Sequence, residues 1–176
     1  MNKNCYESFC DSEQLTRCFP FRCRCIKCCP PRPKPPVICN KKGGYQVQLT
    51  SPAKVFVADK EIVKFNTVIN KSDKNITYNS ETGRFTLLKP SNYLVNWNIS
   101  VEGTATAPFF SFSLCVNNRI YGTATAPIAT SFLSSSSLIT ANDLSTTIEL
   151  LNTTGDTVRL HEISPMANIV IANINN

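Results

Sequence analysis

Cysteine is the residue type whose number and spacing most clearly indicate chemistry in this sequence. The chain has 176 residues and nine cysteines, and eight of the nine lie within the first 39 residues. The eight are Cys5, Cys10, Cys18, Cys23, Cys25, Cys28, Cys29 and Cys39. Thiols at this density can bind a metal ion, form disulfides within the chain or form disulfides to other chains. The conformation of the segment that carries the thiols helps to decide among these three uses.

The segment that carries the thiols is predicted to be extended. Five prolines follow Cys29, at positions 30, 31, 33, 35 and 36, and they exclude both a helix and a central strand. A polyproline-like conformation is expected there. The residues upstream include too few aliphatic side chains to bury a core, and Gly43-Gly44 supplies a flexible joint. We therefore expect an arm over residues 1–44 and a folded domain over residues 45–176.

The residues alone leave three uses of the thiols open. Zinc is supported by Cys25 and Cys28, but a structural zinc site usually has two separated ligand pairs, often with His, and the sole histidine is His161. An internal disulfide framework is opposed by the adjacent Cys28-Cys29 and by the prolines. Disulfides to neighbouring subunits suit an extended segment without a core, and we favour this interpretation.

The charge of the chain is concentrated on the arm. Residues 1–44 have a net charge of +6, whereas residues 45–176 have nine basic and nine acidic side chains. Such charge could bind a polyanion, but aromatic residues for base stacking are sparse and no nucleic-acid motif surrounds them. We expect no nucleic-acid partner. The charge would instead keep the reduced arm soluble, lower nearby thiol pKa values or dock on an acidic neighbouring surface.

The first residues contain no apolar run typical of a signal peptide. No stretch approaches the roughly 18 apolar residues of a membrane span, so we expect no membrane partner. Dense cysteine usage nevertheless points to an oxidising destination. The chain is therefore expected to be made reduced in a cytosol and oxidised later, on a structure exposed to the outside.

The domain sequence alternates between apolar and polar residues with the period of a β-strand. The clearest examples are YLVNWNISV, in which Tyr93, Val95, Trp97, Ile99 and Val101 share one face, and FFSFSLCV, in which Phe110, Phe112, Leu114 and Val116 do. Val63, Phe65, Thr67 and Ile69 are predicted to share another face, and 145–151, 157–163 and 168–174 are later strand candidates. Eight to ten short strands separated by turn-forming residues indicate an all-β sandwich with no helix.

Four further features of the domain have simple structural interpretations. Trp97 is expected in the core, and Cys115 is expected to be a buried, unpaired thiol on the side of its strand opposite Phe112. The hexamer GTATAP occurs at 103–108 and 122–127 and is interpreted as a short edge segment used twice. The serine-rich LSSSS at 133–137 is predicted to be a mobile loop.

The sequence indicates no active site. His161 alternates out of phase with the apolar residues of TVRLHEI and is expected on the surface or at a subunit contact. No nucleophile elbow, phosphate-binding loop or dinucleotide loop is present, and no acidic string suits calcium. We therefore expect that the protein is not an enzyme and that it has no cofactor and no metal site.

The stretch YNSETGRFTLLKPSNYLVNW at 78–97 resembles the signature of the C1q/TNF-like jelly-roll family. The matching residues are, in order, Thr82, Gly83, Phe85, Thr86, Pro90, Tyr93 and Trp97. The resemblance covers residues 46–176 and implies a jelly-roll sandwich that forms a homotrimer. The composition looks most like the C-terminal domains of collagen-like glycoproteins on the surface (exosporium) of bacterial spores. Unlike them, this chain has no Gly-x-y tract.

The arm has a resemblance of its own. Ile26-Lys27-Cys28-Cys29, followed by nine residues and Cys39, is similar to the N-terminal connector of endospore appendage pilins. In that family the connector of one subunit is disulfide-bonded to other subunits, which implies that Cys28, Cys29 and Cys39 are cross-linkers. Cys5, Cys10, Cys18, Cys23 and Cys25 lie outside the family pattern, so no pairing scheme is implied for them.

Together the residues and resemblances predict a self-assembling structural subunit of a disulfide-cross-linked fibre or appendage on a spore surface. Its partners would be other copies of itself and spore-surface anchoring or tip proteins. Two alternatives are a C1q-like trimeric binding or adhesion module and a zinc-binding protein.

Overall fold

The computed structural model describes residues 43–50, 56–103, 106–128, 132–162 and 164–175. The predicted arm lies almost entirely outside this part of the chain, so its boundary at residue 44 stays a prediction. The eight arm cysteines, Cys5, Cys10, Cys18, Cys23, Cys25, Cys28, Cys29 and Cys39, also lie outside the described residues.

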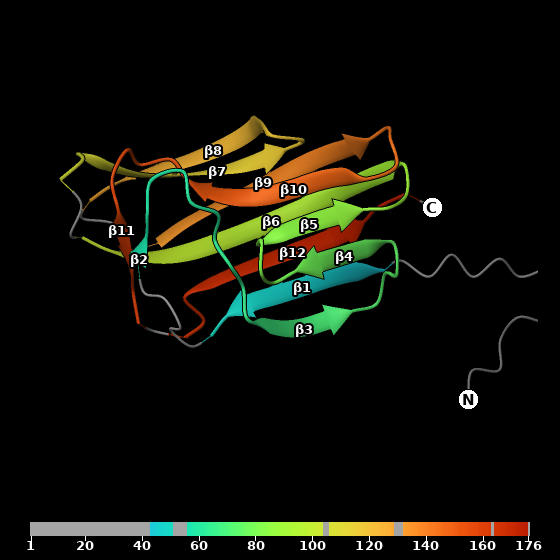
Figure 1. The fold of residues 1–176 in the computed structure, drawn as a ribbon, viewed down its shortest axis with the longest axis horizontal. Helices are drawn as coiled ribbons and strands as arrows, with labels where there is room; N and C mark the ends of the chain where they lie inside the picture. The colour runs from blue at the N-terminus through green and yellow to red at the C-terminus, as the bar shows by residue number, and fades with distance from the viewer. Residues whose placement is uncertain (1–42, 51–55, 104–105, 129–131, 163, 176) are drawn as a thin grey trace, which may run out of the picture. The chain divides into compact units, whose positions relative to one another are not determined.

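The described residues form twelve strands and no helix (Figure 1). The strands are β1 (Gly44–Leu49), β2 (Phe56–Val57), β3 (Thr67–Lys71), β4 (Ile76–Asn79), β5 (Arg84–Leu87), β6 (Ser91–Glu102), β7 (Phe109–Val116), β8 (Arg119–Pro127), β9 (Phe132–Ala141), β10 (Thr146–Asn152), β11 (Val158–Leu160) and β12 (Ala167–Asn173). The predicted all-β class is confirmed for this part of the chain.

The strands pair antiparallel in two sheets. The seven-stranded sheet has the order β2-β11-β6-β12-β1-β3, and β9 also pairs with β6. The five-stranded sheet has the order β4-β5-β10-β7-β8. Twelve-residue β6 is long enough to pair with β12 and β9 along most of its length and with β11 at its last two residues. The result is the predicted sandwich.

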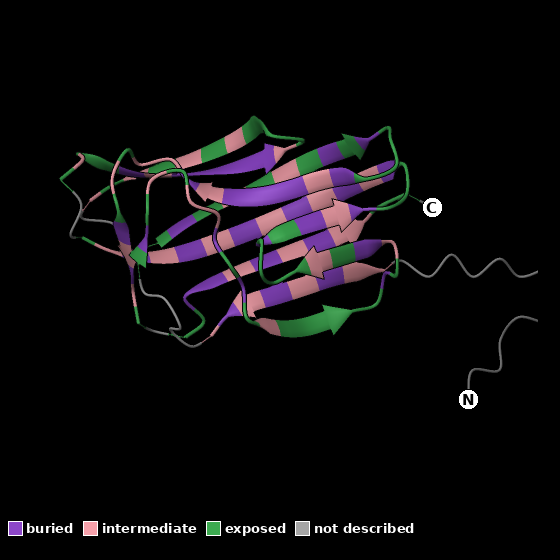
Figure 2. Ribbon diagram, viewed as in Figure 1, coloured by how far each residue is buried: buried purple, intermediate pink, exposed green. Residues whose placement is uncertain are grey.

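The core lies between the inner faces of the two sheets (Figure 2). Every second residue of β6 is buried, from Ser91 to Val101, as the alternation in YLVNWNISV predicts. Trp97 is 2% exposed, which confirms its place in the core. On the opposite sheet, Phe110, Phe112 and Leu114 are completely buried.

Cys115 is buried and free, on the face of β7 opposite Phe112, as predicted. The GTATAP segment at 122–127 forms most of β8, an edge strand of the five-stranded sheet, which confirms that part of the edge-segment prediction. In its first occurrence, residues 104 and 105 lie outside the described residues, and the described part forms no strand between Glu102 and Phe109.

The prediction of a mobile loop at LSSSS (133–137) is wrong. These residues form the first half of β9, which pairs with β6 in register from Phe132 to Ala141. Serine has a weak strand propensity, but ten consecutive residues beside a long central strand satisfy their backbone groups in the ladder and override that preference. Val63, Phe65, Thr67 and Ile69 were predicted to share one face, and their burial differs along that face. Val63 and Phe65 are buried, whereas Ile69, on edge strand β3, is 51% exposed.

Predicted turn residues adopt the backbone conformations that close turns require. Asn117 and Asn118 both have positive φ, at 50° and 63°, and they join β7 to β8 in a tight hairpin. Gly83 has φ 75° in the turn between β4 and β5. A Cβ atom at Gly83 would lie 2.6 Å from Ile62 Cγ2, so glycine is required there for space as well as for conformation.

Candidate functional site

The most distinctive surface of the domain is the outer face of the seven-stranded sheet. Four adjacent strands, β1, β12, β6 and β9, contribute their outward residues to it in lateral rows. The rows are Leu138–Leu94–Ala172–Gly44, Ser136–Asn96–Val170–Gln46 and Ser134–Asn98–Asn168–Gln48. Small, amide and hydroxyl side chains therefore alternate with aliphatic ones across the face, which we call the uncharged face.

Charge is nearly absent from these four strands. Within β1, β6, β9 and β12, Glu102 is the single ionisable acid or base of the Asp, Glu, Lys, Arg and His types, and it ends β6. The nine basic residues and the other eight acidic residues of the domain thus all lie outside these four strands. Burying this face against another protein would require no desolvation of a charged group.

The amide groups of the uncharged face bond to one another along and across the strands. Gln46 Nε2 donates to Asn168 Oδ1 at 2.9 Å, and Gln48 Nε2 donates to the same oxygen at 3.3 Å. On the other side, Thr140 Oγ1 donates to Asn92 Oδ1 at 2.8 Å and the Ser136 hydroxyl donates to Asn96 Oδ1. Hydrogen bonds between these side chains restrict their rotamers, which lowers the entropic cost of burying them against a partner.

One border of the uncharged face is apolar. Leu138, on β9, is 54% exposed and lies directly opposite Leu94 on β6. Next to it, Tyr121 of edge strand β8 is 52% exposed. The Tyr121 hydroxyl donates to the Leu138 carbonyl oxygen at 2.7 Å and so links the two sheets at this side. Contiguous exposed aliphatic and aromatic side chains of this kind mark contact surfaces.

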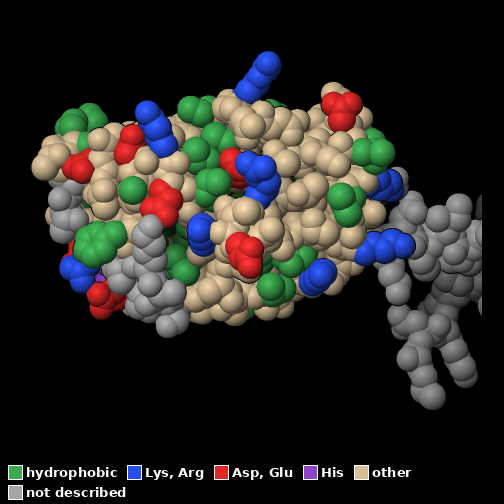
Figure 3. All heavy atoms as spheres, viewed as in Figure 1, with side chains coloured by type: hydrophobic (Ala, Val, Ile, Leu, Met, Phe, Trp, Pro, Cys, Tyr) green, Lys and Arg blue, Asp and Glu red, His purple; other side chains and the backbone are tan. Residues whose placement is uncertain are grey.

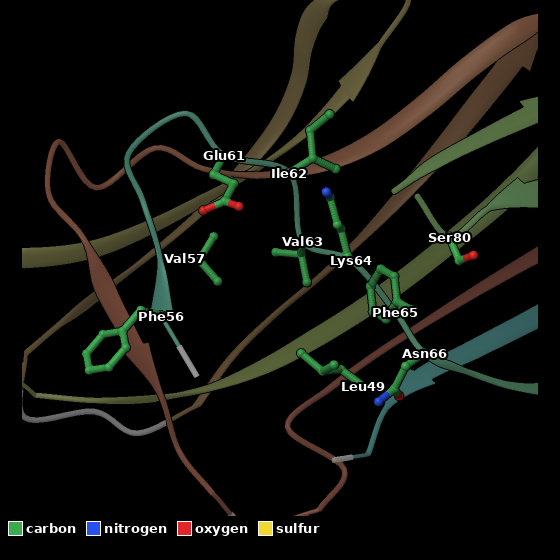
Figure 4. Close-up of a pocket in the computed structure, with 10 residues that line it drawn as sticks. All are labelled: Leu49, Phe56, Val57, Glu61, Ile62, Val63, Lys64, Phe65, Asn66 and Ser80. Atoms are coloured by element: carbon green, nitrogen blue, oxygen red, sulfur yellow. The ribbon is translucent and has the colours of Figure 1, made fainter. Parts of the chain in front are cut away.

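A pocket of about 380 Å³ lies at the end of the sandwich formed by β2. Its lining residues are Leu49, Phe56, Val57, Glu61, Ile62, Val63, Lys64, Phe65, Asn66 and Ser80. Figure 3 shows several Asp and Glu side chains at the left end of the domain, where Figure 1 places β2 and β11. Figure 4 shows Leu49, Val57 and Val63 around the hollow, with Phe56 at its margin. The lining is therefore mostly apolar, with Glu61 and Lys64 as its charged members, and both acidic and basic side chains lie nearby.

Within the described part of the chain, the residues that could carry chemistry do not form a cluster. His161 is half-buried after β11, and Cys115 lies on β7, in the other sheet. Among the described residues, no group of three or more His, Cys, Asp and Glu side chains could hold a metal ion. The described part also contains no helix long and apolar enough to cross a membrane.

No protein-family model matches the sequence, and no curated protein matches it. Solved structures do resemble the domain. The globular domain of zebrafish complement 1qA protein covers 77% of this chain and 99% of its own length, with a TM-score of 0.56 and 16% identity. Murine APRIL covers 76% of this chain and 100% of its own length, with a TM-score of 0.59 and 8% identity.

A third similar structure is Eiger TNF from S. frugiperda, which covers 77% of this chain and 94% of its own length, with a TM-score of 0.56 and 12% identity. The fold is a C1q/TNF-like jelly roll. The resemblance stated from Thr82, Gly83, Phe85 and the residues after them is therefore confirmed at the level of the fold.

The uncharged face of this C1q/TNF-like jelly roll was missed in the sequence. Its signal was present, because Asn and Gln occupy alternate positions of strands whose other positions are apolar, as in Asn96 and Asn98 beside Trp97. Polar residues at those positions read as ordinary solvent-facing residues. These residues form one continuous charge-free surface only because their strands are neighbours in the sheet. The alternation of apolar and polar residues within each strand does not reveal the order of the strands.

Proposed function

We propose that the protein is a self-assembling structural subunit of a disulfide-cross-linked fibre on a bacterial spore surface. In this proposal the domain forms a compact homotrimer through its uncharged face, and the arm joins one subunit group to the next. The chain would be made reduced in the mother-cell cytosol and oxidised once assembled. It would have no catalytic role.

The observation that carries the proposal is the absence of Asp, Lys, Arg and His from four adjacent strands, together with the single Glu102 at their border. A solvated sheet face gains solubility from charged residues, so a large face without them favours burial against another protein. The exposed side chains of Leu138 on β9 and Tyr121 on β8 favour the same interpretation. Self-association is the simplest form of that burial because the sequence carries its own connecting arm.

The arm supplies the second part of the proposal. Eight cysteines on a proline-rich segment can reach neighbouring copies, and a single arm at one end of the chain gives a head-to-tail contact. Such a contact propagates into a filament when it does not close on itself. Disulfides between chains would make the filament resistant to heat and detergent until a reductant is added.

Electrophoresis of the oxidised full-length chain with and without reductant tests this function. We expect a ladder of high-mass species without reductant, a monomer band with it, and filaments in electron micrographs of the oxidised sample. The triple variant Cys28→Ser, Cys29→Ser, Cys39→Ser should form fewer and smaller disulfide-linked species without reductant. Cys115→Ser is the matched control and should leave it unchanged, because that thiol is buried in the domain. A monomer band in oxidised, unreduced protein would contradict the proposal.

A further inference from the structure

The pocket at the β2 end lies far from the point where the arm joins the domain. Strand β1 begins at Gly44, next to the arm, and ends at Leu49, which lines the pocket. Five residue steps at about 3.3 Å each separate the two positions by about 17 Å. The neighbouring strand β12 fixes both ends, because Asn173 N donates to the Gly43 carbonyl and Met166 N donates to the Leu49 carbonyl.

The charge beside the pocket is negative. Phe56, which lines the pocket, lies opposite Arg159 in the pairing of β2 with β11. Arg159 forms ion pairs with Glu102 at 3.3 Å and with Glu162 at 2.8 Å, so this group has one more carboxylate than cations.

Further carboxylates come from the segments that close this end. Asp59 Oδ1 accepts a hydrogen bond from Gly155 N at 2.9 Å, and Glu61 Oε2 accepts one from Ala58 N at 2.9 Å. Hydrogen bonds from the Thr106 hydroxyl and backbone lower the pKa of Asp156, which keeps its carboxylate ionised. The described residues 56–66, 102 and 156–162 together have five carboxylates and three cations, a net formal charge of −2.

The arm contains a segment with the complementary pattern. Residues 18–29 read CFPFRCRCIKCC, in which Phe19, Phe21 and Ile26 lie among Arg22, Arg24 and Lys27, with no acidic residue. Two phenyl rings suit a hollow whose apolar lining includes Leu49, Val57, Val63 and Phe65. The adjacent cations suit Glu61 in the lining and the excess of carboxylates around it, which outnumber the nearby cations even with Lys64 counted.

We propose that the β2-end pocket of one copy receives residues 18–29 of a second copy. The Phe19-Pro20-Phe21 sequence lies against the apolar lining, and the basic side chains lie over the surrounding carboxylates. This inference rests on the proposed function and specifies the surface on which the arm docks. Because the arm begins at one end of β1 and the pocket lies at the other, the contact is heterologous and repeats from copy to copy.

The first experiment locates the contact directly. A photo-crosslinking p-benzoyl-phenylalanine replaces Phe56 in the full-length chain, which is reduced, mixed with an equal amount of ¹⁵N-labelled protein of the same sequence, and allowed to oxidise. Phe56 is 51% exposed, so the replacement leaves the core intact. After irradiation, mass spectrometry should find cross-links to residues 18–29, with mixed-isotope pairs among them.

Mixed-isotope pairs distinguish copies because an arm of about 42 residues is long enough to reach the pocket of its own chain. Cross-links to residues 18–29 found only within one isotope would overturn the inference, and so would cross-links that map elsewhere in a sample that forms filaments. The latter result would leave the fibre proposal standing. Failure of the unmodified chain to form any disulfide-linked polymer would contradict both.

A matched pair of variants gives a second measurement. Phe56→Ser and Phe109→Ser each shorten a phenylalanine that is about half exposed, at 51% and 52%, and only the first lines the pocket. We expect the rate of polymer formation to fall at least tenfold in Phe56→Ser and to stay within twofold of the unmodified rate in Phe109→Ser. Equal rates in the two variants would overturn the inference.

Discussion

Cys115 on β7 lies directly opposite Glu149 on β10, on the face of the five-stranded sheet that points away from the core. Both residues are 5% exposed, and Glu149 also forms an ion pair with Arg84. Burial raises the pKa of the Cys115 thiol, and the nearby Glu149 carboxylate raises this pKa further. A thiol in this position is held protonated, whereas disulfide exchange requires the thiolate.

We therefore predict that Cys115 resists alkylation in the folded protein. Reduced full-length chain treated with iodoacetamide at pH 8 should be modified at its arm cysteines, while Cys115 reacts only after urea is added. Peptide mass spectrometry measures each site. Raising the pH should increase labelling of Cys115 in the folded protein later than in the unfolded protein, because the folded thiol has the higher pKa. Equal labelling rates for Cys115 and Cys39 would contradict the prediction.

Leu138→Lys should weaken self-association. The side chain is on the border of the uncharged face, where a new ammonium group would be buried without a partner, at a cost of about 3–5 kcal/mol. Light scattering of the reduced chain should show a shift towards monomer, with an association constant lowered on the order of 100-fold or more. Leu144→Lys is the control, because Leu144 is 70% exposed between β9 and β10. Equal association by the two variants would argue against this surface.

Much of the fold was predictable from the sequence because its strongest signals are local. The alternation of apolar and polar residues around Trp97 predicts strand β6. Asn117 and Asn118 are turn-forming residues, and both have the positive φ angles that a tight turn requires. These features depend on neighbouring residues in the chain. The sandwich follows from them because each strand has a single apolar face that must be covered.

The candidate site was not predictable, because it depends on strand order. LSSSS was predicted to be a loop, yet Ser134 and Ser136 lie beside Asn98 and Asn96 as part of the uncharged face. The pocket likewise brings Ser80 beside Leu49 and Phe56, which lie more than 20 residues before it in the chain and meet it only after the sheets close. Long-range pairing decides both surfaces, and no local propensity encodes it.

Gly83→Ala should destabilise the domain more than Gly155→Ala. Both glycines have positive φ, at 75° and 82°, so alanine costs each about 1–2 kcal/mol of backbone strain. At Gly83 the new Cβ would also lie 2.6 Å from Ile62 Cγ2 and 3.1 Å from the Val63 carbonyl oxygen, whereas at Gly155 nothing lies within 4 Å. Urea unfolding should separate the two variants by at least about 1 kcal/mol. Equal free energies of unfolding would show that the Ile62 segment moves aside freely.

Tyr78→Phe should change how stability depends on alkaline pH. The Tyr78 hydroxyl accepts from Phe65 N at 2.7 Å and donates to the Phe65 carbonyl at 3.1 Å. Its removal should cost about 1–3 kcal/mol at neutral pH. Burial raises the pKa of Tyr78 from 10.0 to about 12. The folded state therefore holds the Tyr78 proton more tightly than the unfolded state does. The contribution of the Tyr78 hydroxyl to the free energy of unfolding is complete below pH 10 and is lost as the pH rises through about 12.

The difference in unfolding free energy between the wild type and Tyr78→Phe should consequently shrink between pH 10 and 12. Urea titrations at several pH values in that range measure it. The other buried tyrosines, Tyr45 and Tyr93, are present in both proteins, so their titration cancels in the comparison. A difference that stays constant over this range would contradict the assignment.

Asn152→Asp should disrupt the end of the sandwich that contains the pocket. Asn152 is completely buried, and its Nδ2 donates to the carbonyl oxygens of Val57 at 2.9 Å, Ala58 at 3.2 Å and Asp156 at 2.8 Å. An aspartate there would direct a buried negative charge at three carbonyl oxygens. We expect the free energy of unfolding to fall by about 3–5 kcal/mol at pH 7.

The loss should be smaller at pH 5, because a buried carboxyl group facing acceptors has a raised pKa and becomes neutral as the pH falls. A protonated aspartate can donate one hydrogen bond, so the rescue would be partial. Asn70→Asp, at an exposed position of edge strand β3, is the control and should change stability by less than about 0.5 kcal/mol at either pH. Urea unfolding of both variants at the two pH values decides the matter. A loss of stability in Asn152→Asp that does not depend on pH would show that the missing Nδ2 hydrogen bonds, and not a buried negative charge, cause the loss.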